Sequence, residues 1–283
     1  MTPTGTDTSR RAFAALLALP DEAIDLGQAA LLIAREEYPD LEVGPYLLRL
    51  DEMAETVRSR LRGGEGFTSR IAHLNRLLFE EMGFRGNREE YYDPRNSFLN
   101  DVLDRRIGIP ITLSAVYLEV ARRIDFPLAG VSFPGHFLVR YTGREASTEI
   151  LVDPWNRGAI LTEEECRRRL EDMYRGKVPF RKEFLKRART REILERMLNN
   201  LKAIYEGQRD YHRALRVQQM LVCVHPGAPP QIRDRGLIHY RLALLAQAAE
   251  DLESYVEAAP DAPDTAEIRE RLVEIRRLTP RMN

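Results

Sequence analysis

Apolar residues in the first sixty positions recur at helical spacing. They repeat every three or four positions from Leu26 to Ala34 and again from Leu47 to Val57. Gly63-Gly64-Glu65-Gly66 breaks this pattern, and a further helix is expected from Thr68 to Met82. We therefore expect residues 1–62 to form a helical opening segment.

The middle of the chain predicts one buried helix followed by short strands. Pro110 suits the first position of a helix, where its missing N–H costs nothing, and apolar residues continue to Ile124. Short apolar or β-branched runs separated by turn residues then predict strands, at 128–133, 136–141 and 149–152. Thr162 with Glu165 forms a capping box, which starts the next helix.

The last hundred residues are helical and carry an internal repeat. Ala214 and Ala248 each lie twelve residues before a proline, and these prolines, Pro226 and Pro260, are 34 residues apart. In a tetratricopeptide unit of about 34 residues, a small residue on the second helix packs against the first helix and proline ends the unit. The spacing predicts two such units, with 267–278 as a capping helix.

The repeat departs from the usual pattern at Lys202, where a small residue is common, and at Gln218, where an apolar residue is common. Because fewer than three repeats seldom make a concave groove, helices that merely complete the fold are the alternative. The order of elements gives an α+β, helix-rich domain with a small antiparallel sheet over 1–180, followed by an α-helical domain over 190–283. The boundary is expected near residues 176–189.

Composition excludes several classes of protein. The 283 residues are 43% hydrophobic and 31% charged, as in an ordered globular protein. With 43 basic and 44 acidic side chains, no global field favours nucleic acid or an anionic membrane, and no apolar run is long enough to span a bilayer. Residues 181–191 form a local basic stretch, which we interpret as a solvated helix face rather than a nucleic-acid site.

Cysteine and histidine usage bears on compartment and cofactors. Cys166 and Cys223 cannot make a disulfide framework, which favours a reducing compartment. The run from Ser9 to Leu19 has the arginine pair and apolar stretch of an export signal, but Pro20-Asp21-Glu22 ends it without a cleavage site, so we expect an amphipathic first helix and a cytoplasmic protein. The five histidines show no metal-ligand spacing, and we expect neither metal nor cofactor.

His136 and Asp153 are the candidate catalytic residues. His136 lies at the start of one predicted strand and Asp153 ends another, seventeen residues later. At equivalent ends of neighbouring strands they can meet, so that the carboxylate holds the imidazole tautomer and the other ring nitrogen faces a nucleophile. A purely structural hydrogen bond is the alternative.

Several motifs resemble a known family. Gly108-Ile109-Pro110, Phe126-Pro127, Gly135-His136-Phe137 and Val152-Asp153-Pro154 resemble the transglutaminase-like superfamily, which has a papain-type Cys-His-Asp fold. The segment Asp93–Leu99, with Arg105–Leu113, is similar to the bacterial SirB-type branch, whose members carry a C-terminal tetratricopeptide segment. The resemblance covers nearly the whole chain.

One departure from this family concerns the nucleophile. In active members a cysteine begins the buried helix, seventeen residues before the proline that closes it, and that position is Pro110 here. Thr112 and Ser114 are weak substitutes, for which packing or a backbone hydrogen bond is the expected role. Cys166 is expected to be a structural or surface thiol.

Polar residues beside the expected cleft are candidate ligand-binding residues. They are Asp93, Arg95, Asn96, Asn100, Arg105 and Arg106, together with Trp155 beside Asp153. A plain i,i+4 pair between Asp101 and Arg105 is the alternative for part of this cluster.

The sequence thus favours a non-catalytic binding or scaffold protein that contacts a protein partner through its C-terminal helices. The runner-up is a hydrolase or acyl transferase in which His136 is the base and a hydroxyl or water is the nucleophile. Nucleic-acid binding through residues 181–191 is the weakest of the three hypotheses.

Overall fold

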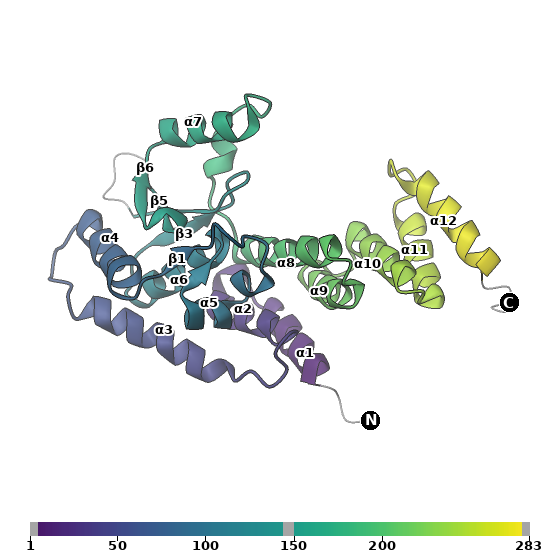
Figure 1. Ribbon diagram of the computed structural model, residues 1–283, viewed down its shortest axis with the longest axis horizontal. Helices are drawn as coiled ribbons and strands as arrows, with labels where there is room; N and C mark the ends of the chain where they lie inside the picture. The colour runs from purple at the N-terminus through teal and green to yellow at the C-terminus, as the bar shows by residue number, and fades with distance from the viewer. Residues whose placement is uncertain (1–4, 144–149, 279–283) are drawn as a thin grey trace. The chain divides into compact units, whose positions relative to one another are not determined.

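The computed structural model describes residues 5–143 and 150–278, in two compact units, Met1–Met197 and Leu198–Asn283 (Figure 1). The first unit opens with helices, as expected. They are α1 (Gly5–Leu17), α2 (Leu26–Ala34), α3 (Val43–Arg58) and α4 (Phe67–Asn75), with a 3₁₀ turn at Asp21–Ala23 between α1 and α2. Helix α4 continues into a π-helical segment, Arg76–Glu81, so the predicted helix from Thr68 to Met82 is present but changes its winding.

Helix α1 packs against α2 through buried apolar side chains and an ion pair. Phe13 is fully buried, and Arg10 binds Glu36 through two hydrogen bonds of 3.0 and 2.8 Å. The segment that has the arginine pair of an export signal is therefore a folded amphipathic helix of the first unit.

Two very short strands connect the helices before the sheet. The strands β1 (Arg85–Gly86) and β2 (Ile107–Gly108) pair in parallel on either side of a 3₁₀ turn (Pro94–Asn96) and helix α5 (Leu99–Arg105). Sequence patterns missed this pair, because two residues are too few to show a period.

Helix α6 (Pro110–Arg123) is the central helix of the first unit. Every residue from Pro110 to Ala121 is buried, which confirms the predicted buried helix. Proline at its first position loses no hydrogen bond, because the first N–H groups of a helix have no partner within the helix.

The sheet is antiparallel, as predicted, and has four strands in the order β3-β4-β5-β6. They are β3 (Leu128–Val131), β4 (Leu138–Tyr141), β5 (Leu151–Asp153) and β6 (Ala159–Leu161), with a 3₁₀ turn (Pro154–Asn156) after β5. The expected strands end earlier or begin later than predicted, β6 was not predicted, and Glu149 of the third expected strand lies outside the described residues.

The sheet is covered by helices. Leu138 and Leu151 share one buried cluster with Cys166 and Leu170 of α7 (Glu163–Tyr174). Side chains alternate along a strand, so their neighbours point to the opposite face, and α6 packs against β3 and β4. The capping box of Thr162 and Glu165 that starts α7 is confirmed.

The two units meet in the chain at Met197, later than the expected boundary near residues 176–189. A 3₁₀ turn (Lys182–Leu185) precedes helix α8 (Thr190–Gly207). The Ala188 N–H donates to Gly130 O of β3, and Leu194 and Met197 are fully buried. The start of α8 therefore belongs to the first unit.

The second unit consists of helical pairs. After the last turns of α8 come α9 (Tyr211–Val224), α10 (Pro229–Arg241), α11 (Leu245–Ala258) and α12 (Thr265–Leu278). Ala214 and Ala248 are fully buried, which is the packing expected of the small residue in each repeat. Helix α12 buries Ile268 and Leu272 against α11, as expected of a capping helix.

Both departures from the repeat pattern have a polar partner on α10. The Lys202 ammonium lies 2.6 Å from Asp234, and the buried Gln218 amide donates at 2.9 Å to the backbone oxygen of Gln231. The ammonium of Lys202 and the amide nitrogen of Gln218 are thus paired, whereas the buried side-chain oxygen of Gln218 has no partner among the described residues.

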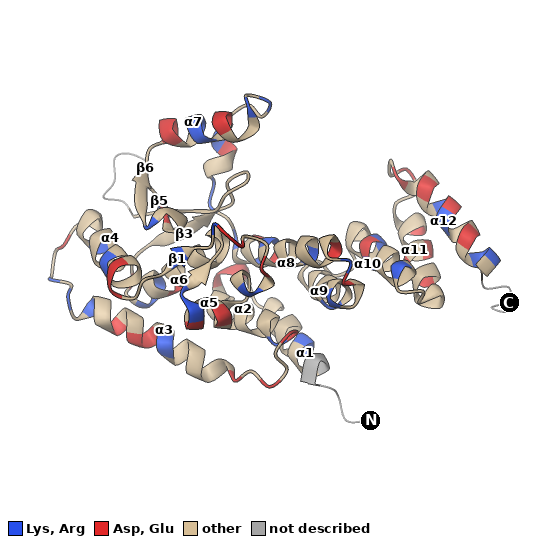
Figure 2. Cartoon of the chain, in the orientation of Figure 1, with Lys and Arg blue, Asp and Glu red and all other residues tan. Residues whose placement is uncertain are grey.

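Charges of both signs are interspersed over the helices (Figure 2). Red and blue segments occur together on α3, α7 and α12. None of the described helices is long and apolar enough to cross a membrane.

Candidate functional site

His136 is held in place by a tight turn before β4. Its N–H donates to Phe133 O at 3.0 Å, and Gly135 between them has φ +68°, a conformation that favours glycine. A Cβ at Gly135 would lie 2.3 Å from the sulfur of Met173, so a larger residue there would also have to displace this exposed side chain.

Asp153 ends β5 next to His136, and the predicted contact is present. Val139 pairs with Val152, so continuing the register places Asp153 opposite Leu138, two residues from His136. Asp153 Oδ1 lies 2.9 Å from His136 Nε2. The side chain of Asp153 is fully buried, whereas that of His136 is 14% exposed. Only the histidine can reach a ligand.

Asp153 has two further partners that sequence reasoning missed. The Asn156 amide donates to Oδ2 at 2.6 Å, and Arg169 of α7 donates to the same oxygen at 2.5 Å. Burial alone would raise the pKa of Asp153, but the hydrogen bonds from His136, Asn156 and Arg169 outweigh it and lower the pKa to about 2. The carboxylate is therefore ionised at neutral pH and fixes the proton of His136 on Nε2.

A cavity of about 470 Å³ opens beside His136. Its volume is within the range of small-molecule sites. The lining comes from the turn before β4, the turn after β5, helix α7 and the segment after β1. The lining residues are Arg88, Phe133, His136, Leu138, Trp155, Asn156, Cys166, Arg169, Asp172 and Met173.

The start of α6 supplies no nucleophile to this cavity. Pro110 is buried and has no nucleophilic atom. The Thr112 hydroxyl is buried; it accepts from the Ile109 N–H at 3.0 Å and donates to Asn96 O at 2.7 Å. Ser114 is also fully buried, and its hydroxyl has no hydrogen-bond partner among the described residues. None of the three is among the residues that line the cavity.

Cys166 lines the cavity, although the sequence pointed only to a structural or surface thiol. It is fully buried in the cluster between the sheet and α7. Burial raises the pKa of its thiol to about 11, although Arg169 opposes this. A thiol in this environment is protonated at neutral pH.

Most of the predicted binding cluster is an internal network rather than a cavity wall. Arg95 and Arg105 both contact Asp93, the buried Asn96 amide donates to Glu90 O, and Arg106 donates to Met82 O. Asn100 is buried on α5. Of the seven residues predicted to bind a ligand, only Trp155 lines the cavity.

The expected pair between Asp101 and Arg105 is wrong. Asp101 instead accepts from the Tyr38 hydroxyl at 2.8 Å, while Arg105 lies 3.4 Å from Asp93. Helical spacing allows an i,i+4 contact, but tertiary partners decide where each side chain lies.

Aromatic side chains extend from the cavity. The Trp155 ring packs on Gly86, where a Cβ would come within 2.5 Å of it. Tyr91 lies edge-on to Trp155 at 5.8 Å and to Tyr92 at 5.3 Å, and Tyr92 is 73% exposed. No sequence pattern linked Tyr91, Arg88 or Arg169 to His136, because Arg88 and Tyr91 lie in the segment after β1 and Arg169 lies on α7.

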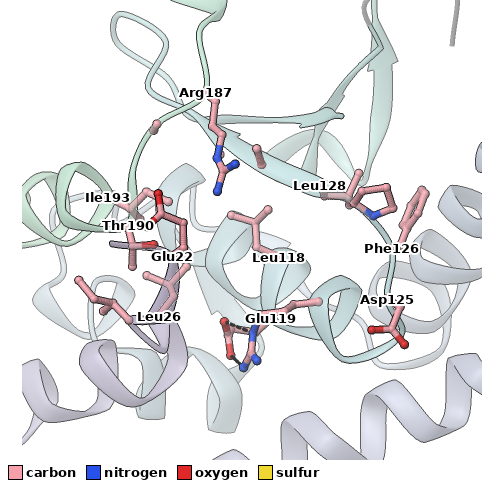
Figure 3. A pocket seen from close by; sticks show the side chains of 16 residues that line it. Glu22, Leu26, Leu118, Glu119, Asp125, Phe126, Leu128, Arg187, Thr190 and Ile193 are labelled. Atoms are coloured by element: carbon pink, nitrogen blue, oxygen red, sulfur yellow. Dashed lines mark hydrogen bonds and ion pairs between the residues drawn. The ribbon is translucent and has the colours of Figure 1, made fainter. Parts of the chain in front are cut away.

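A second cavity, of about 450 Å³, lies at the C-terminal half of α6. Figure 3 shows Leu118 and Glu119 on its helical side and Arg187 extending toward Leu118. Glu119 is buried and bound by Arg122, and Arg122 also lies 2.9 Å from Asp25. These acidic groups are therefore neutralised within the protein.

Arginines of the basic stretch 181–191, which includes Arg187, also make contacts within the protein. Arg191 donates to Leu19 O and its N–H to Asp21, and Arg189 pairs with Glu192. Among residues 5–143 and 150–278, no three His, Cys, Asp or Glu side chains gather as a metal site.

The fold and the His–Asp pair define a transglutaminase-like protein, and comparison with known families agrees. Residues 45–199 match the transglutaminase-like superfamily, and residues 201–273 match the tetratricopeptide repeat. The chain belongs to the transglutaminase-like superfamily, and the resemblance to its bacterial SirB-type branch is confirmed.

Named relatives extend over most of the chain. The UPF0162 protein of Xylella fastidiosa (strain 9a5c) is 39% identical over 263 residues, which is 92% of this chain and 93% of the relative. Protein SirB1 of Salmonella typhimurium and the UPF0162 protein YchA of Escherichia coli K12 are each 31% identical over 238 residues, 84% of this chain and 87% of each relative. No solved structure gives a significant match.

Proposed function

We propose that this protein is a non-catalytic member of the transglutaminase-like superfamily that acts by binding a protein partner through its C-terminal helices. The observation that carries the proposal is that the start of α6 presents no nucleophilic side chain to the cavity. Pro110 occupies it, the Thr112 hydroxyl is bonded to backbone groups, and Ser114 is sealed from the cavity. We further propose that it acts in the cytoplasm, because two cysteines that form no disulfide favour a reducing compartment.

The second unit offers a surface for the partner. A cavity of about 440 Å³ is lined by charged and aromatic side chains of α8, α9, α10 and α12. Lys202 and Asp234 in its wall neutralise each other, whereas the exposed Arg241 pairs with no carboxylate among the described residues. Because the lining holds basic and acidic side chains in equal number, a polypeptide segment with polar side chains and an acidic group opposite Arg241 matches it.

The catalytic half of the proposal is tested with activated acyl esters and with glutamine amides. We expect the wild-type chain and His136→Ala to release product at the same rate, equal to that of an unrelated protein at the same concentration. A wild-type rate that falls about 100-fold or more in His136→Ala would show general-base catalysis and overturn this half.

The binding half is tested by charge reversal on the second unit. The full chain and Arg241→Glu are used to capture partners from cells of the source bacterium, with Arg269→Glu as the matched control. Arg269 is an exposed arginine of α12 that does not line the cavity. We expect one protein to be retained by the wild type and Arg269→Glu and lost with Arg241→Glu. Equal capture by all three would exclude this surface.

One observation favours a second candidate, a hydrolase with an activated water as nucleophile. The cavity beside His136 is open, and Asp153 holds the ring through Nε2, which leaves Nδ1 as the available base. The ester assay with His136→Ala distinguishes the two candidates.

A further inference from the structure

The cavity beside His136 contains hydrogen-bond donors that the fold does not use. Arg88 donates to the side-chain oxygen of Asn156 at 2.7 Å and pairs with no carboxylate among the described residues. A guanidinium has five N–H donors and strongly favours a carboxylate partner. Most of the binding capacity of Arg88 is therefore open to a ligand.

His136 adds a second donor or acceptor on the same cavity. Its Nε2 is bound to Asp153, and within the described parts of the chain no partner is found for Nδ1. In the protonated ring Nδ1 is a donor, so it can bind an oxyanion while Asp153 balances the charge.

The charges around the cavity select for a single negative charge. Arg88 and Arg169 are positive, and the buried Asp153 and the exposed Asp172 are negative, so these four groups sum to zero. A monoanion bound to the cationic ring of His136, in which both nitrogens carry a proton, leaves the site neutral, whereas a dianion leaves an uncompensated charge in a partly closed cavity.

The remaining wall is apolar. Phe133 and Leu138 are almost fully buried, and the Trp155 ring and the 48%-exposed Met173 line the cavity. Such a wall accommodates an aliphatic or aromatic group beside the charged group.

We propose that the His136 cavity binds a monocarboxylate attached to an apolar group, with Arg88 and His136 as donors to the carboxylate and Trp155 against the apolar part. The C-terminal residue of a polypeptide and a free carboxylic acid both have this chemistry. This binding site is independent of the proposed partner surface on the C-terminal helices.

Trp155 makes the test selective, because it is the single tryptophan of the chain. The full chain is titrated with N-acetyl-leucine, and its tryptophan fluorescence is recorded. N-acetyl-leucine amide, which lacks the charge, is the ligand control. We expect a saturable change with the acid and at least about ten-fold weaker binding of the amide. Equal binding of acid and amide would overturn the proposal.

Three variants test which side chains bind the acid. Arg88→Gln should weaken binding of the acid about ten-fold, whereas Asp172→Asn should tighten it, because a like charge is removed. Arg62→Gln, an exposed arginine that lines none of the described cavities, should change nothing. The proposal requires Arg88→Gln and Asp172→Asn to change the affinity for the acid in opposite directions. If Arg88→Gln fails to fold, weaker or unchanged binding of the acid by Asp172→Asn still contradicts the proposal.

A second acid distinguishes the two sources of the carboxylate. If 4-methylpentanoate binds as tightly as N-acetyl-leucine, the peptide group contributes nothing and a free acid is the ligand. If N-acetyl-leucine binds more tightly, a polypeptide C-terminus is the ligand. Mass analysis of N-acetyl-alanyl-leucine after incubation reports cleavage separately. Cleavage would refute the non-catalytic function but leave the binding site intact.

Discussion

Arg169 on helix α7 donates a hydrogen bond of 2.5 Å to Oδ2 of Asp153 on strand β5. The other carboxylate oxygen binds His136. The helix that covers the sheet is therefore bonded to the carboxylate that orients the histidine. A carboxylate held in this way is part of the fold as well as of the site.

We expect Asp153→Asn to lower the free energy of unfolding by about 1–2 kcal/mol, because it removes the buried carboxylate charge that accepts hydrogen bonds from His136, Asn156 and the partly exposed Arg169. Urea unfolding at neutral pH measures this change. Asp172→Asn, which removes an exposed carboxylate of the same helix, should shift the free energy by less than about 0.5 kcal/mol. Equal effects of the two variants would show that the charge of the Asp153 carboxylate contributes nothing to stability.

The lowered pKa of Asp153 predicts how stability depends on pH. Its pKa is about 2 in the folded protein, against an ordinary value of 3.8. This contribution is fully present above pH 3.8 and is lost as the pH falls through about 2; over that window it amounts to roughly 2 kcal/mol. Urea midpoints measured from about pH 5 to about pH 2 should fall more steeply for the wild type than for Asp153→Asn. Parallel curves would contradict the assignment.

The sequence predicted the parts of this site that depend on local pattern. His136 and Asp153 were paired because strand ends can be recognised from turns and β-branched residues, whereas Pro110 was assigned to the nucleophile position by the resemblance to the transglutaminase-like superfamily. Arg169 was not predicted, because a capping box shows where α7 begins but not which strand it covers. The partners of a side chain across elements depend on packing, which a single sequence does not display.

The same limit applies to the domain boundary and to the sixth strand. The chain from Ala188 to Met197 has the helical pattern of the repeats that follow, yet its apolar side chains are buried in the first unit. Strand β6 has only three residues, Ala159–Leu161, too few to show alternation. By contrast, the 34-residue spacing of Pro226 and Pro260 was sufficient to predict the helical repeats of the second unit, because the same small residue and proline recur in each repeat.

Thr112 should prove to be a structural residue. In Thr112→Val the Ile109 N–H and the Asn96 carbonyl both lose a buried partner, so we expect a loss of about 2 kcal/mol in the free energy of unfolding. Thr56→Val is the matched control, because Thr56 also donates to a backbone oxygen, at 2.9 Å, but at an exposed site on α3. If Thr112→Val were as stable as Thr56→Val, the Thr112 hydroxyl would have no structural role, and a role as nucleophile would have to be considered again.

Cys166 should be chemically inert in the folded protein. Because burial raises its pKa to about 11, we expect iodoacetamide at about pH 8 to leave Cys166 unmodified over hours. Mass spectrometry of proteolytic fragments measures the modification, and the same protein unfolded in urea is the control in which Cys166 must react. Rapid labelling in the folded state would identify an activated thiol beside His136 and would contradict the non-catalytic proposal.

Gly158 and Asn75 hold the backbone of Asp153 in place through hydrogen bonds. The Gly158 N–H donates to Asp153 O, and the Asn75 amide donates to Gly158 O at 2.9 Å while accepting from Tyr117. A Cβ at Gly158 would lie 1.9 Å from the Asn75 oxygen, so Gly158→Ala must displace this amide.

Gly176→Ala separates that collision from backbone strain. Both glycines have φ +73°, but a Cβ at Gly176 would meet nothing within 4 Å. Each substitution bears the strain of a positive φ, about 1 kcal/mol, and Gly158→Ala should lose a further 1–3 kcal/mol or so from the broken hydrogen bonds. Urea unfolding of the two variants measures the difference. If it is absent, Asn75 does not support Asp153, and the position of the carboxylate depends on His136, Asn156 and Arg169 alone.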